Sequence, residues 1–352
     1  MNITFLIGNG FDLRMGMNTR FIDMYEDYIA QASSSEAIQK FKDMLAADAP
    51  NYKTWGDFEM AMAAQAKEFD CEDSFIECLR DFKLYMVSHL QKEDFHFNER
   101  ISASKNAKSL CINEVTKSIE NFYVGLIPNV MNTLLSLGIK NDPHLSFVSF
   151  NYTKAFDNVL TPFAGEVIHI HGTLGSDIVL GADNMEQVVH LPYKTTRKFE
   201  RAFIKPGFNK VFDAARLEKA RSAIANSDVI CIYGMSLGKS DFSWTKTLKD
   251  WLISNKKHHL IYFVYDERQF DKSNWDAIID EEEARILSFL TRICDSTEEV
   301  NQLFDQVHIP VGYNIFDVDN ILSIEKKRAD EERQRREAVH ARISEGDQLI
   351  MR

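Results

Sequence analysis

The fold is decided by one stretch near the start of the chain, Ile3-Thr4-Phe5-Leu6-Ile7-Gly8-Asn9-Gly10-Phe11-Asp12. Its largely apolar first half predicts a buried strand, and the two glycines allow a sharp turn from that strand into a helix. Such a turn can bring backbone amides close to a ligand, although the G-x-G-x-x-G fingerprint is incomplete. A tight turn with Asp12 as the helix N-cap explains the same residues. Thr19, after a second turn at Gly16, is predicted to cap the next helix.

Five further apolar runs predict the remaining strands. They end in glycine or polar turns and lie at Leu145–Phe150, Val167–His171, Val229–Tyr233, Leu260–Tyr265 and Val307–Val311. Pro310 suits the last run to an edge strand, because proline cannot donate a hydrogen bond to a central ladder. Helical stretches lie between the runs, so we expect an α/β fold with a Rossmann-like, mostly parallel sheet.

The interval between the first two predicted strands is far longer than a crossover helix requires. We therefore predict an inserted helical subdomain at residues 21–140 and an α/β core at residues 1–20 and 141–318. Two apolar stripes at helical spacing support the insertion: Phe75-Leu79-Phe82-Met86-Leu90 and Ile112-Val115-Ile119-Phe122-Leu126. Residues 319–352 are predicted to form a charged helix or tail, since residues 325–342 contain seven Lys or Arg and five Asp or Glu.

The composition excludes several classes of protein. Of the 352 residues, 45% are hydrophobic and 27% charged, which is typical of globular proteins. The formal net charge of −12 gives no strong signal for nucleic-acid binding. The five cysteines contain no C-x-x-C pair, which argues against a disulfide scaffold or a four-cysteine zinc module and favours a cytoplasmic location. No apolar run is long enough for a membrane helix, and the amino terminus is predicted to be a strand rather than a signal peptide.

Polar residues follow the second and third predicted strands. Asn151 and Tyr152 lie at the carboxyl edge of the sheet, where open α/β sheets bind ligands, although an asparagine that only makes an Asx turn is the alternative. Strand alternation predicts that His169 and His171 point to one face. His171, followed by Gly172, is the candidate general base because imidazole titrates near neutral pH. We expect His169 to be a buried, hydrogen-bonded residue, and no metal, because further ligands are not visible.

The segment Gly234-Met235-Ser236-Leu237-Gly238 follows another predicted strand. Its glycines allow close approach of a nucleotide, and Ser236 could bind a ribose or phosphate. The same letters satisfy G-x-S-x-G, the nucleophile elbow of serine hydrolases, with Asp266 and His308 downstream in a workable order. The elbow needs its helix to begin at the serine, whereas this helix is expected to begin near Asp241.

Taken together, these segments resemble the bacteriophage abortive-infection AbiH family. The resemblance rests on five motifs in the family's order: Ile7-Gly8-Asn9-Gly10-Phe11-Asp12-Leu13 with Gly16 and Thr19, Trp55-Gly56-Asp57-Phe58-Glu59, Phe150-Asn151-Tyr152-Thr153, His169-Ile170-His171-Gly172, and Gly234-x-Ser236-Leu237-Gly238-x-Ser240-Asp241. That family is in turn similar to the sirtuin-like NAD-binding fold.

The resemblance implies that the ligand is NAD or a related nucleotide. It implies Asn151 near the nicotinamide ribose, His171 as the base, and a nucleotide-binding set of Gly8, Asn9, Gly10, Phe11, Asp12, Thr19, Tyr152, Gly172, Gly234, Ser236 and Asp241. Thr153 stands where deacylases usually carry an acidic residue, and their zinc module is absent. Cleavage of NAD at the nicotinamide–ribose bond, which sirtuin-like defence proteins perform, is therefore the expected activity.

Three hypotheses for the function follow. The first is a phage-defence effector that cleaves NAD, the second a non-catalytic nucleotide-binding sensor or partner-binding defence protein, and the third a serine hydrolase that uses Ser236. In a defence role the activity has to stay off until infection. The helical insertion and the charged carboxyl-terminal helix are both candidates for sensing a phage trigger or partner protein, or for homo-oligomer contacts.

Overall fold

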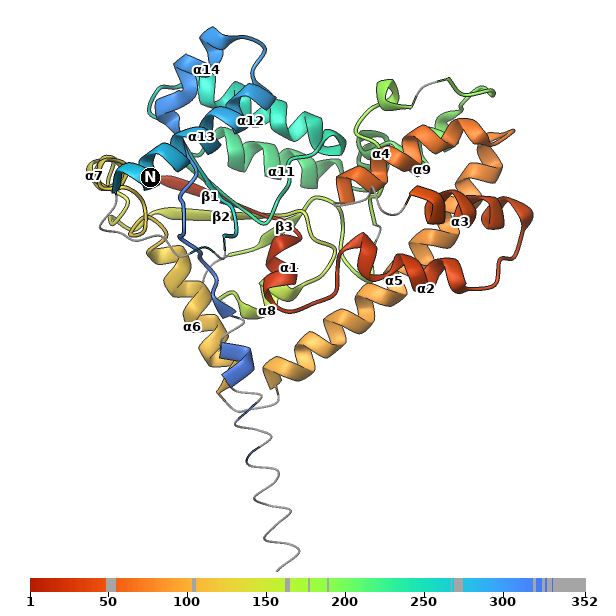
Figure 1. Ribbon diagram of the computed structural model, residues 1–352, viewed down its shortest axis with the longest axis horizontal. Helices are drawn as coiled ribbons and strands as arrows, with labels where there is room; N and C mark the ends of the chain where they lie inside the picture. Colours follow the sequence, from red (N-terminus) through yellow and green to blue (C-terminus); the bar gives the residue numbers. More distant parts are fainter. Residues whose placement is uncertain are drawn as a thin grey trace, which may run out of the picture.

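The computed structural model is an α/β protein built around a six-stranded sheet (Figure 1). It describes residues 1–48, 55–102, 106–161, 165–176, 178–188, 190–266, 268, 275–318, 321–324, 327 and 331. The strands are β1 (Asn2–Ile7), β2 (His144–Ser149), β3 (Val167–His169), β4 (Val229–Tyr233), β5 (His259–Phe263) and β6 (Val307–His308). All neighbouring strands are parallel, which confirms the predicted fold class.

Helices occupy most of the remaining described chain. They are α1 (Gly10–Arg14), α2 (Tyr25–Ala30), α3 (Glu36–Asp48), α4 (Trp55–Gln65), α5 (Glu72–Ser102), α6 (Ala107–Glu120), α7 (Pro128–Ser136), α8 (Ala155–Val159), α9 (Arg197–Phe203), α10 (Lys205–Phe212), α11 (Ala214–Ala225), α12 (Phe242–Ser254), α13 (Trp275–Ile293) and α14 (Thr297–Leu303). Short 3-10 turns lie at η1 (Phe21–Asp23), η3 (Ala66–Glu68), η4 (Met185–Gln187), η5 (Lys239–Asp241) and η6 (Phe304–Gln306). No helix of the described residues is long and apolar enough to cross a membrane.

The strand order is β3-β2-β1-β4-β5-β6. The chain builds the sheet outward from β1 to β3, and then continues on the other side of β1 from β4 to β6. In Rossmann-like folds this reversal opens a crevice at the carboxyl ends of the two central strands, here β1 and β4. The two-residue strand β6 lies at the edge, as the proline after it predicted.

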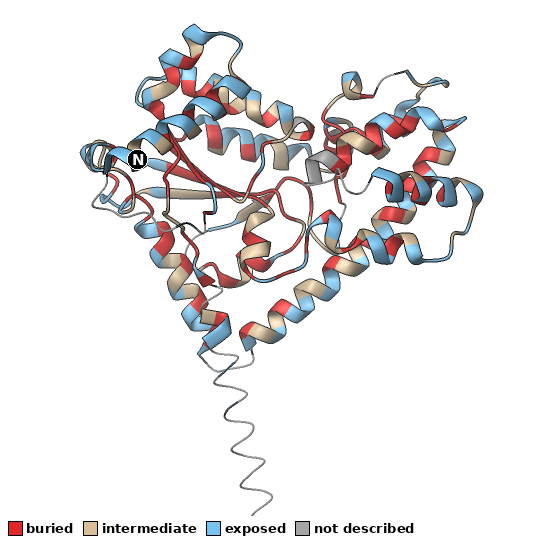
Figure 2. Ribbon diagram, in the orientation of Figure 1, coloured by how far each residue is buried: buried red, intermediate tan, exposed pale blue. Residues whose placement is uncertain are grey.

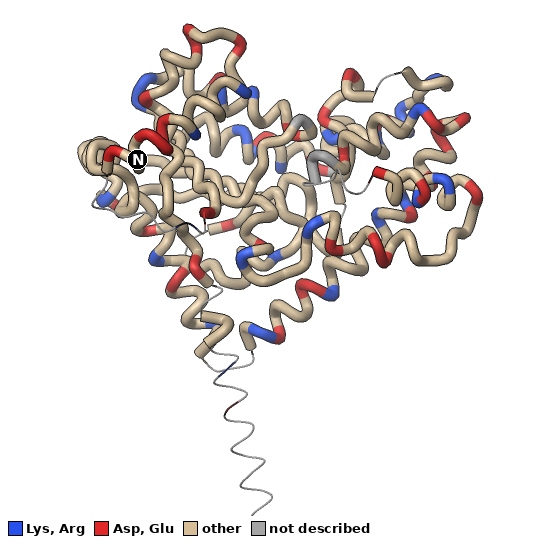
Figure 3. Tube along the Cα trace, viewed as in Figure 1, with Lys and Arg blue, Asp and Glu red and all other residues tan. Residues whose placement is uncertain are grey.

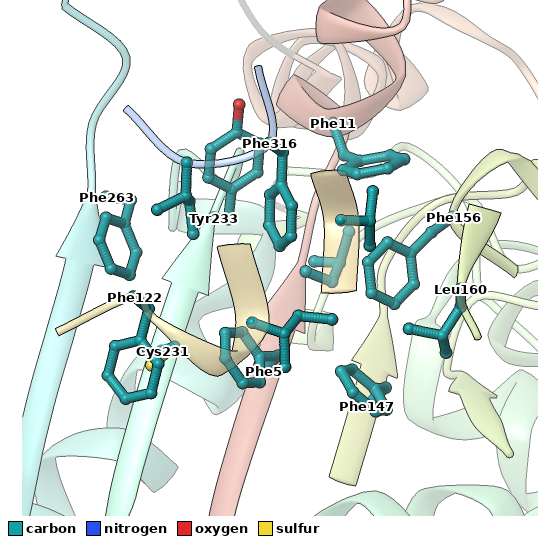
Figure 4. Packing of buried hydrophobic residues seen from close by; sticks show 14 of the residues in the cluster. Phe5, Phe11, Phe122, Phe147, Phe156, Leu160, Cys231, Tyr233, Phe263 and Phe316 are labelled. Carbon is teal, nitrogen blue, oxygen red and sulfur yellow. The ribbon is translucent and has the colours of Figure 1, made fainter. Parts of the chain in front are cut away.

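Helices cover both faces of the sheet (Figures 1 and 2). One face packs against α6, α7 and α8, and the other packs against α11, α12 and α13. Figure 4 shows the first face, where Phe5 stacks on Phe147 at 5.7 Å between ring centroids and meets the edge of Phe122. The strands themselves carry no Asp, Glu, Lys or Arg, and Figure 3 shows these residues on the surrounding helices and loops.

Residues 21–140, predicted as one insertion, pack in two places. Helices α2 to α4 and the first half of α5 form a helical lobe. Its apolar core also includes residues from the segment between Ile178 and Ile204, which contains α9. The end of α5, with α6 and α7, instead packs on the sheet. The stripe from Phe75 to Leu90 is buried, as predicted. The domain boundaries stay a prediction, and the predicted charged helix at 319–352 lies largely outside the described residues.

Candidate functional site

A cavity of about 310 Å³ lies at the carboxyl ends of β1 to β4, where the strand order reverses. It is lined by the turns after these strands and, from the helical lobe and the segment leading to it, by Thr19, Arg20, Phe21, Glu59 and Leu90. The four polar segments that the sequence singled out therefore meet in one place. Parallel strands end at a common edge, so residues far apart in the chain converge there.

Most of the predicted site residues line this cavity. They are Gly8, Asn9, Gly10, Asp12, Thr19, Asn151, Tyr152, His171, Gly234, Ser236 and Asp241. The structure does not bring Phe11 or Gly172 to it. Gly172 instead forms the turn after β3, with a φ of 80° and its amide donating to the His169 carbonyl.

Phe11 belongs to the apolar core. Its ring packs edge-on against Phe156 at 5.0 Å and against Phe316 at 5.5 Å between centroids (Figure 4). The residue lies in α1 and packs toward α8 and the carboxyl-terminal segment. Asp12, the next residue, instead contacts the segment that follows β2. The expectation that Phe11 binds a nucleotide is therefore wrong for its side chain.

The glycines of the first turn are needed for packing between two turns. A Cβ built on Gly10 would lie 2.5 Å from the Gly234 Cα, and one on Gly8 would lie 2.6 Å from the Gly234 carbonyl oxygen. The Gly10 amide donates to that carbonyl, and the Phe11 amide donates to the Gly8 carbonyl. Because both amides are engaged within the protein, this turn offers a phosphate less than a complete Rossmann fingerprint does.

One wall of the cavity is built around Asp12. One interpretation of the sequence made Asp12 a helix N-cap. The structure contradicts it, because α1 begins at Gly10 and its N-cap is Asn9. The carboxylate of Asp12 instead accepts from Thr153 Oγ1 at 2.6 Å and from Asn151 Nδ2 at 2.9 Å. Burial raises the pKa of Asp12 to about 7, and these two hydrogen bonds oppose the rise only in part.

In this wall Asn151 has an amide oxygen, Oδ1, that accepts no hydrogen bond from the described residues. Its Nδ2 donates to Asp12 and, at 3.1 Å, to the Gly8 carbonyl, which fixes the orientation of the amide. Its Oδ1 is buried and has no hydrogen-bond partner among the residues that the structure describes. A buried carbonyl without a donor is costly, so this atom is suited to accept a hydrogen bond from a ligand.

Asn9 and Thr19 join the first turn to the segment that leads to the helical lobe. Thr19 Oγ1 donates to Asn9 Oδ1 at 2.7 Å, and Asn9 Nδ2 donates to the Thr19 carbonyl at 3.3 Å. Thr19 was predicted to cap the next helix. This prediction is wrong, because Arg20 is the N-cap of η1. The pair positions Arg20, the basic side chain that the cavity gains from this segment.

A second part of the cavity wall holds His171 among aromatic rings. Phe150 meets it edge-on at 5.5 Å and Tyr152 lies at 6.1 Å between centroids. Its Nε2 is 3.9 Å from Asp241 Oδ1, beyond hydrogen-bond distance. Burial, followed by the positive charge of Lys205, lowers the pKa of His171 to about 3. The imidazole is therefore neutral at physiological pH in this arrangement.

His169 and His171 do not share a face. The strand that was predicted to reach His171 ends at His169, so the alternation stops between them. The ring of His169 points away from the cavity, with Nε2 at 3.0 Å from the Asp157 carboxylate and Nδ1 at 3.2 Å from the Asn151 carbonyl. The expectation of a buried, hydrogen-bonded His169 is confirmed.

A buried charge network lies beside His171. Lys205 Nζ donates to Glu59 Oε2 at 2.9 Å, to Asp241 Oδ1 at 3.0 Å and to the Ser240 carbonyl at 3.0 Å. Burial opposes the charge of Lys205, but the two carboxylates outweigh it and raise its pKa. Burial likewise opposes the charge of Asp241, but Lys205 prevails and lowers its pKa.

The backbone explains how these three charges meet. The amide of Lys205 donates to the Ala182 carbonyl beside a short parallel bridge, which sets the start of α10. Glu59 Oε1 accepts from the Gly181 amide at 3.1 Å, and a Cβ at Gly181 would collide with the Phe203 carbonyl. The network thus ties α4 in the helical lobe to the turn before α12.

A model of the family described as Bacteriophage abortive infection AbiH matches residues 4–265. The chain belongs to the AbiH family. The match spans β1 to β5 and every residue that lines the cavity. Membership implies a role in phage abortive-infection defence. Comparison with curated proteins and with solved structures gave no match.

The structure of this AbiH protein does not assemble the triad of Ser236, Asp266 and His308 that the serine-hydrolase interpretation requires. The His308 ring faces His259, with 3.1 Å between the nearest nitrogens, and the Asp266 carboxylate accepts from Arg268 and Arg285. Among the described residues no hydrogen bond joins either of them to Ser236. His308 pairs with Ile261 within the sheet on the edge strand β6, whereas Ser236 follows the end of β4. Nor do the described residues contain three His, Cys, Asp or Glu side chains placed to hold a metal ion.

Sequence reasoning missed several positions in or beside the candidate site. Glu59 was quoted only as part of a family motif, and Thr153 only as part of a family motif and as a departure from the sirtuin pattern. Arg20 and Lys205 were not singled out at all. Lys205 lies 146 residues from Glu59 and 36 from Asp241, and no local spacing signals such a contact.

Proposed function

We propose that this AbiH protein binds NAD or a related nucleotide in the cavity and cleaves the bond between nicotinamide and ribose. The observation that carries the proposal is the buried, unpartnered Oδ1 of Asn151 at the switch point of the sheet. Sheets with the order 3-2-1-4-5-6 bind dinucleotides at this point. The motifs in which the sequence resembles the sirtuin-like NAD-binding fold contribute residues to the lining of this same cavity.

The lining of the cavity fits the nicotinamide riboside half of NAD. The rings of Phe150, Tyr152 and Phe21 offer apolar faces to a planar heterocycle, and Asn151 Oδ1 would accept from a ribose hydroxyl. A volume of about 310 Å³ suits a nucleoside-sized group rather than a whole dinucleotide. The phosphates would extend to the solvent side, where the exposed Arg20 and Ser236 lie.

The chemistry has a simple balance. As the bond between nicotinamide nitrogen and ribose breaks, its electron pair neutralises the pyridinium, and the sugar gains oxocarbenium character. A water then bonds to the sugar carbon and loses a proton. His171 is the proposed acceptor of this proton, while Asn151 orients the ribose and the carboxylates of the cavity favour the developing positive charge.

One observation favours the alternative of a non-catalytic nucleotide sensor. A general base works best when its pKa lies near the operating pH, and the pKa of His171 is lowered to about 3. In the arrangement seen here the imidazole is a weak base. A sensor would use the same cavity and bind the nucleotide without turnover.

Incubation of the purified full chain with NAD, with free nicotinamide followed by chromatography, tests both. Cleavage predicts release that falls at least about 100-fold in His171→Ala, the usual contribution of a positioned acid–base group, and that also falls in Asn151→Ala, which loses the group that orients the ribose. His308→Asn, a change at a buried histidine outside the cavity, is the matched control and should retain release. If the wild type releases nothing, a thermal shift with NAD or ADP-ribose decides: a shift supports the sensor, and no shift overturns both functions.

A further inference from the structure

We propose that Lys205 is a positioning residue of this site: shared between Glu59 and Asp241, it holds the Asp241 carboxylate away from His171 and keeps the imidazole uncharged. The inference rests on the proposed function only in that His171 is the base proposed there. Its electrostatic content can be tested without any nucleotide.

The geometry around Asp241 carries the argument. One oxygen, Oδ1, is 3.0 Å from Lys205 Nζ and 3.9 Å from His171 Nε2. The nearer cation takes the hydrogen bond, and the imidazole is left with a weaker, non-bonded attraction. Asp241 is the N-cap of α12 but makes no side-chain capping bond there, so its carboxylate is committed to Lys205.

Lys205 has no spare donor for a ligand. Its three hydrogen bonds to Glu59, Asp241 and the Ser240 carbonyl use the three protons of the ammonium group. The side chain is buried, and Lys205 itself does not line the cavity although both of its carboxylate partners do. Its effect on a reaction therefore has to pass through Asp241 and His171.

The other charges near His171 do not change this conclusion. Asp241 favours the protonated imidazole, whereas Lys205 and, more weakly, Arg216 disfavour it. A hydrogen bond with the Phe150 backbone favours it too, and the phenol of Tyr152, which lies beside the ring, stays neutral because burial raises its pKa. Lys205 is thus the leading charged group that opposes protonation of His171.

The network also links His171 to the helical lobe. Glu59 lies on α4 of the lobe and accepts from the Lys205 ammonium group, while the Lys205 backbone is bonded to Ala182 in the lobe core. A displacement of α4 relative to that segment would separate Glu59 from Lys205 and change the hydrogen bonding of Asp241.

The test is an NMR titration of the His171 ring in the full chain, with its signal assigned by its loss in His171→Ala. The double variant Glu59→Gln with Lys205→Met removes one positive and one negative charge together, so that Asp241 remains beside the histidine without Lys205, and Arg216 acts only weakly. We expect the wild-type signal to stay flat between about pH 4 and 7, and the double variant to titrate in that range, because a carboxylate freed to approach an imidazole raises its pKa.

Two control variants separate positioning from packing. Lys42→Met removes another buried lysine, one that donates to the Gln31 carbonyl in the helical lobe, and should leave the His171 signal flat. Lys205→Arg keeps the charge and should behave like the wild type. A folded double variant whose His171 signal stays flat would overturn the proposal, as would an equal change in Lys42→Met.

These outcomes are independent of the proposed function. If NAD is not cleaved but the double variant titrates, the positioning role stands and the cleavage proposal fails. If NAD is cleaved, the acidic limb of the kcat/KM pH profile should move to higher pH in the double variant.

Discussion

The wall of the cavity around Asp12 and the wall around Asp241 shift the pKa of a carboxylate in opposite directions, and Asp241 is the more exposed of the two residues. Asp12 is surrounded by neutral donors, Thr153 and Asn151, and its pKa is raised by burial to about 7. Asp241 is paired with Lys205, which holds its pKa below the usual value against the effect of burial. At Asp12 the hydrogen bonds from neutral groups only moderate the effect of burial, whereas at Asp241 the charge of Lys205 outweighs it. Glu59 shares Lys205 but is more deeply buried, and burial raises its pKa.

The difference gives the cavity one carboxyl that can change its charge near neutral pH and one that stays ionised. Environments that push the pKa values of neighbouring acids apart are typical of sites that handle protons. Here the group that titrates near neutral pH, Asp12, accepts a hydrogen bond from Asn151, and the ionised group, Asp241, lies near His171. The two walls therefore supply orientation and charge separately.

The largest expected effect comes from disrupting the close contact between the backbones of Gly234 and Gly10, which both line the cavity. Gly234→Ala adds a Cβ 2.7 Å from the Gly10 Cα at a φ of 71°, and we expect a loss of at least about 3 kcal/mol from strain and overlap together. Gly175→Ala, also at positive φ but with open space around it, should lose only about 1–2 kcal/mol. Urea denaturation of both variants measures this, and equal losses would show that the turn contact is not tight.

The Asp12 wall should respond to pH in the range where the Asp241 wall does not. The pKa of Asp12 is about 7 in the folded protein and near 3.8 unfolded, so the folded state holds its proton more strongly between these values. Stability is then lost as pH rises toward and through 7. From pH 5 to 8 the wild type should lose on the order of 2–3 kcal/mol relative to Asp12→Asn.

Asp241→Asn is the comparison for this titration. The pKa of Asp241 lies below its usual value, so its contribution to stability is lost only as the pH falls through the acid range. Denaturation curves at pH 5 and pH 8 should show a changed pH dependence in Asp12→Asn and an unchanged one in Asp241→Asn. The same slope in all three proteins would mean that Asp12 is ionised throughout.

A smaller change sharpens the same contrast. Thr153→Val removes the 2.6 Å hydrogen bond to Asp12 and leaves burial less opposed, so the pKa of Asp12 rises further. We expect a loss of about 1–3 kcal/mol that is greatest above pH 7, where the carboxylate is charged. Thr153→Ser keeps the hydroxyl and should retain most of the stability. A loss in Thr153→Val that does not depend on pH would show that packing, rather than the hydrogen bond, is responsible.

The smallest effect is expected at the solvent side of the cavity. Ser236 is exposed, and Ser236→Ala should change stability by less than about 0.5 kcal/mol. Nicotinamide release should also persist, since Ser236 forms no catalytic triad in this fold. Complete loss of activity in this variant would contradict that assignment.

Local sequence patterns predicted the framework well. Buried strands show as short apolar runs, and the turns after them carry polar residues, so the segments at Gly8, Asn151, His171 and Gly234 could be found one by one. That they meet follows from parallel strands ending at a common edge. The sequence thereby predicted most of the cavity lining without any knowledge of the strand order.

The errors and omissions have a common physical cause. Phe11 lies inside a binding motif, but a one-residue step along α1 turns its side chain into the core. Alternation failed at His171 because the strand ends two residues earlier. Lys205 escaped notice because its partners come from other elements, and burial of a lysine among carboxylates leaves no periodic trace in the sequence. Side-chain direction and long-range pairing depend on packing, which local patterns do not encode.

The central claim is that Asn151 Oδ1 accepts a hydrogen bond from a bound nucleotide. Calorimetric titration of the full chain with NAD and with ADP-ribose tests it most directly, with Asn151→Ala compared against His308→Asn, a change outside the cavity. The account predicts binding to the wild type and to His308→Asn, and an affinity at least about tenfold lower in Asn151→Ala, which corresponds to about 1.4 kcal/mol for one buried hydrogen bond. Equal affinity in all three proteins, or no binding by the wild type, would contradict it.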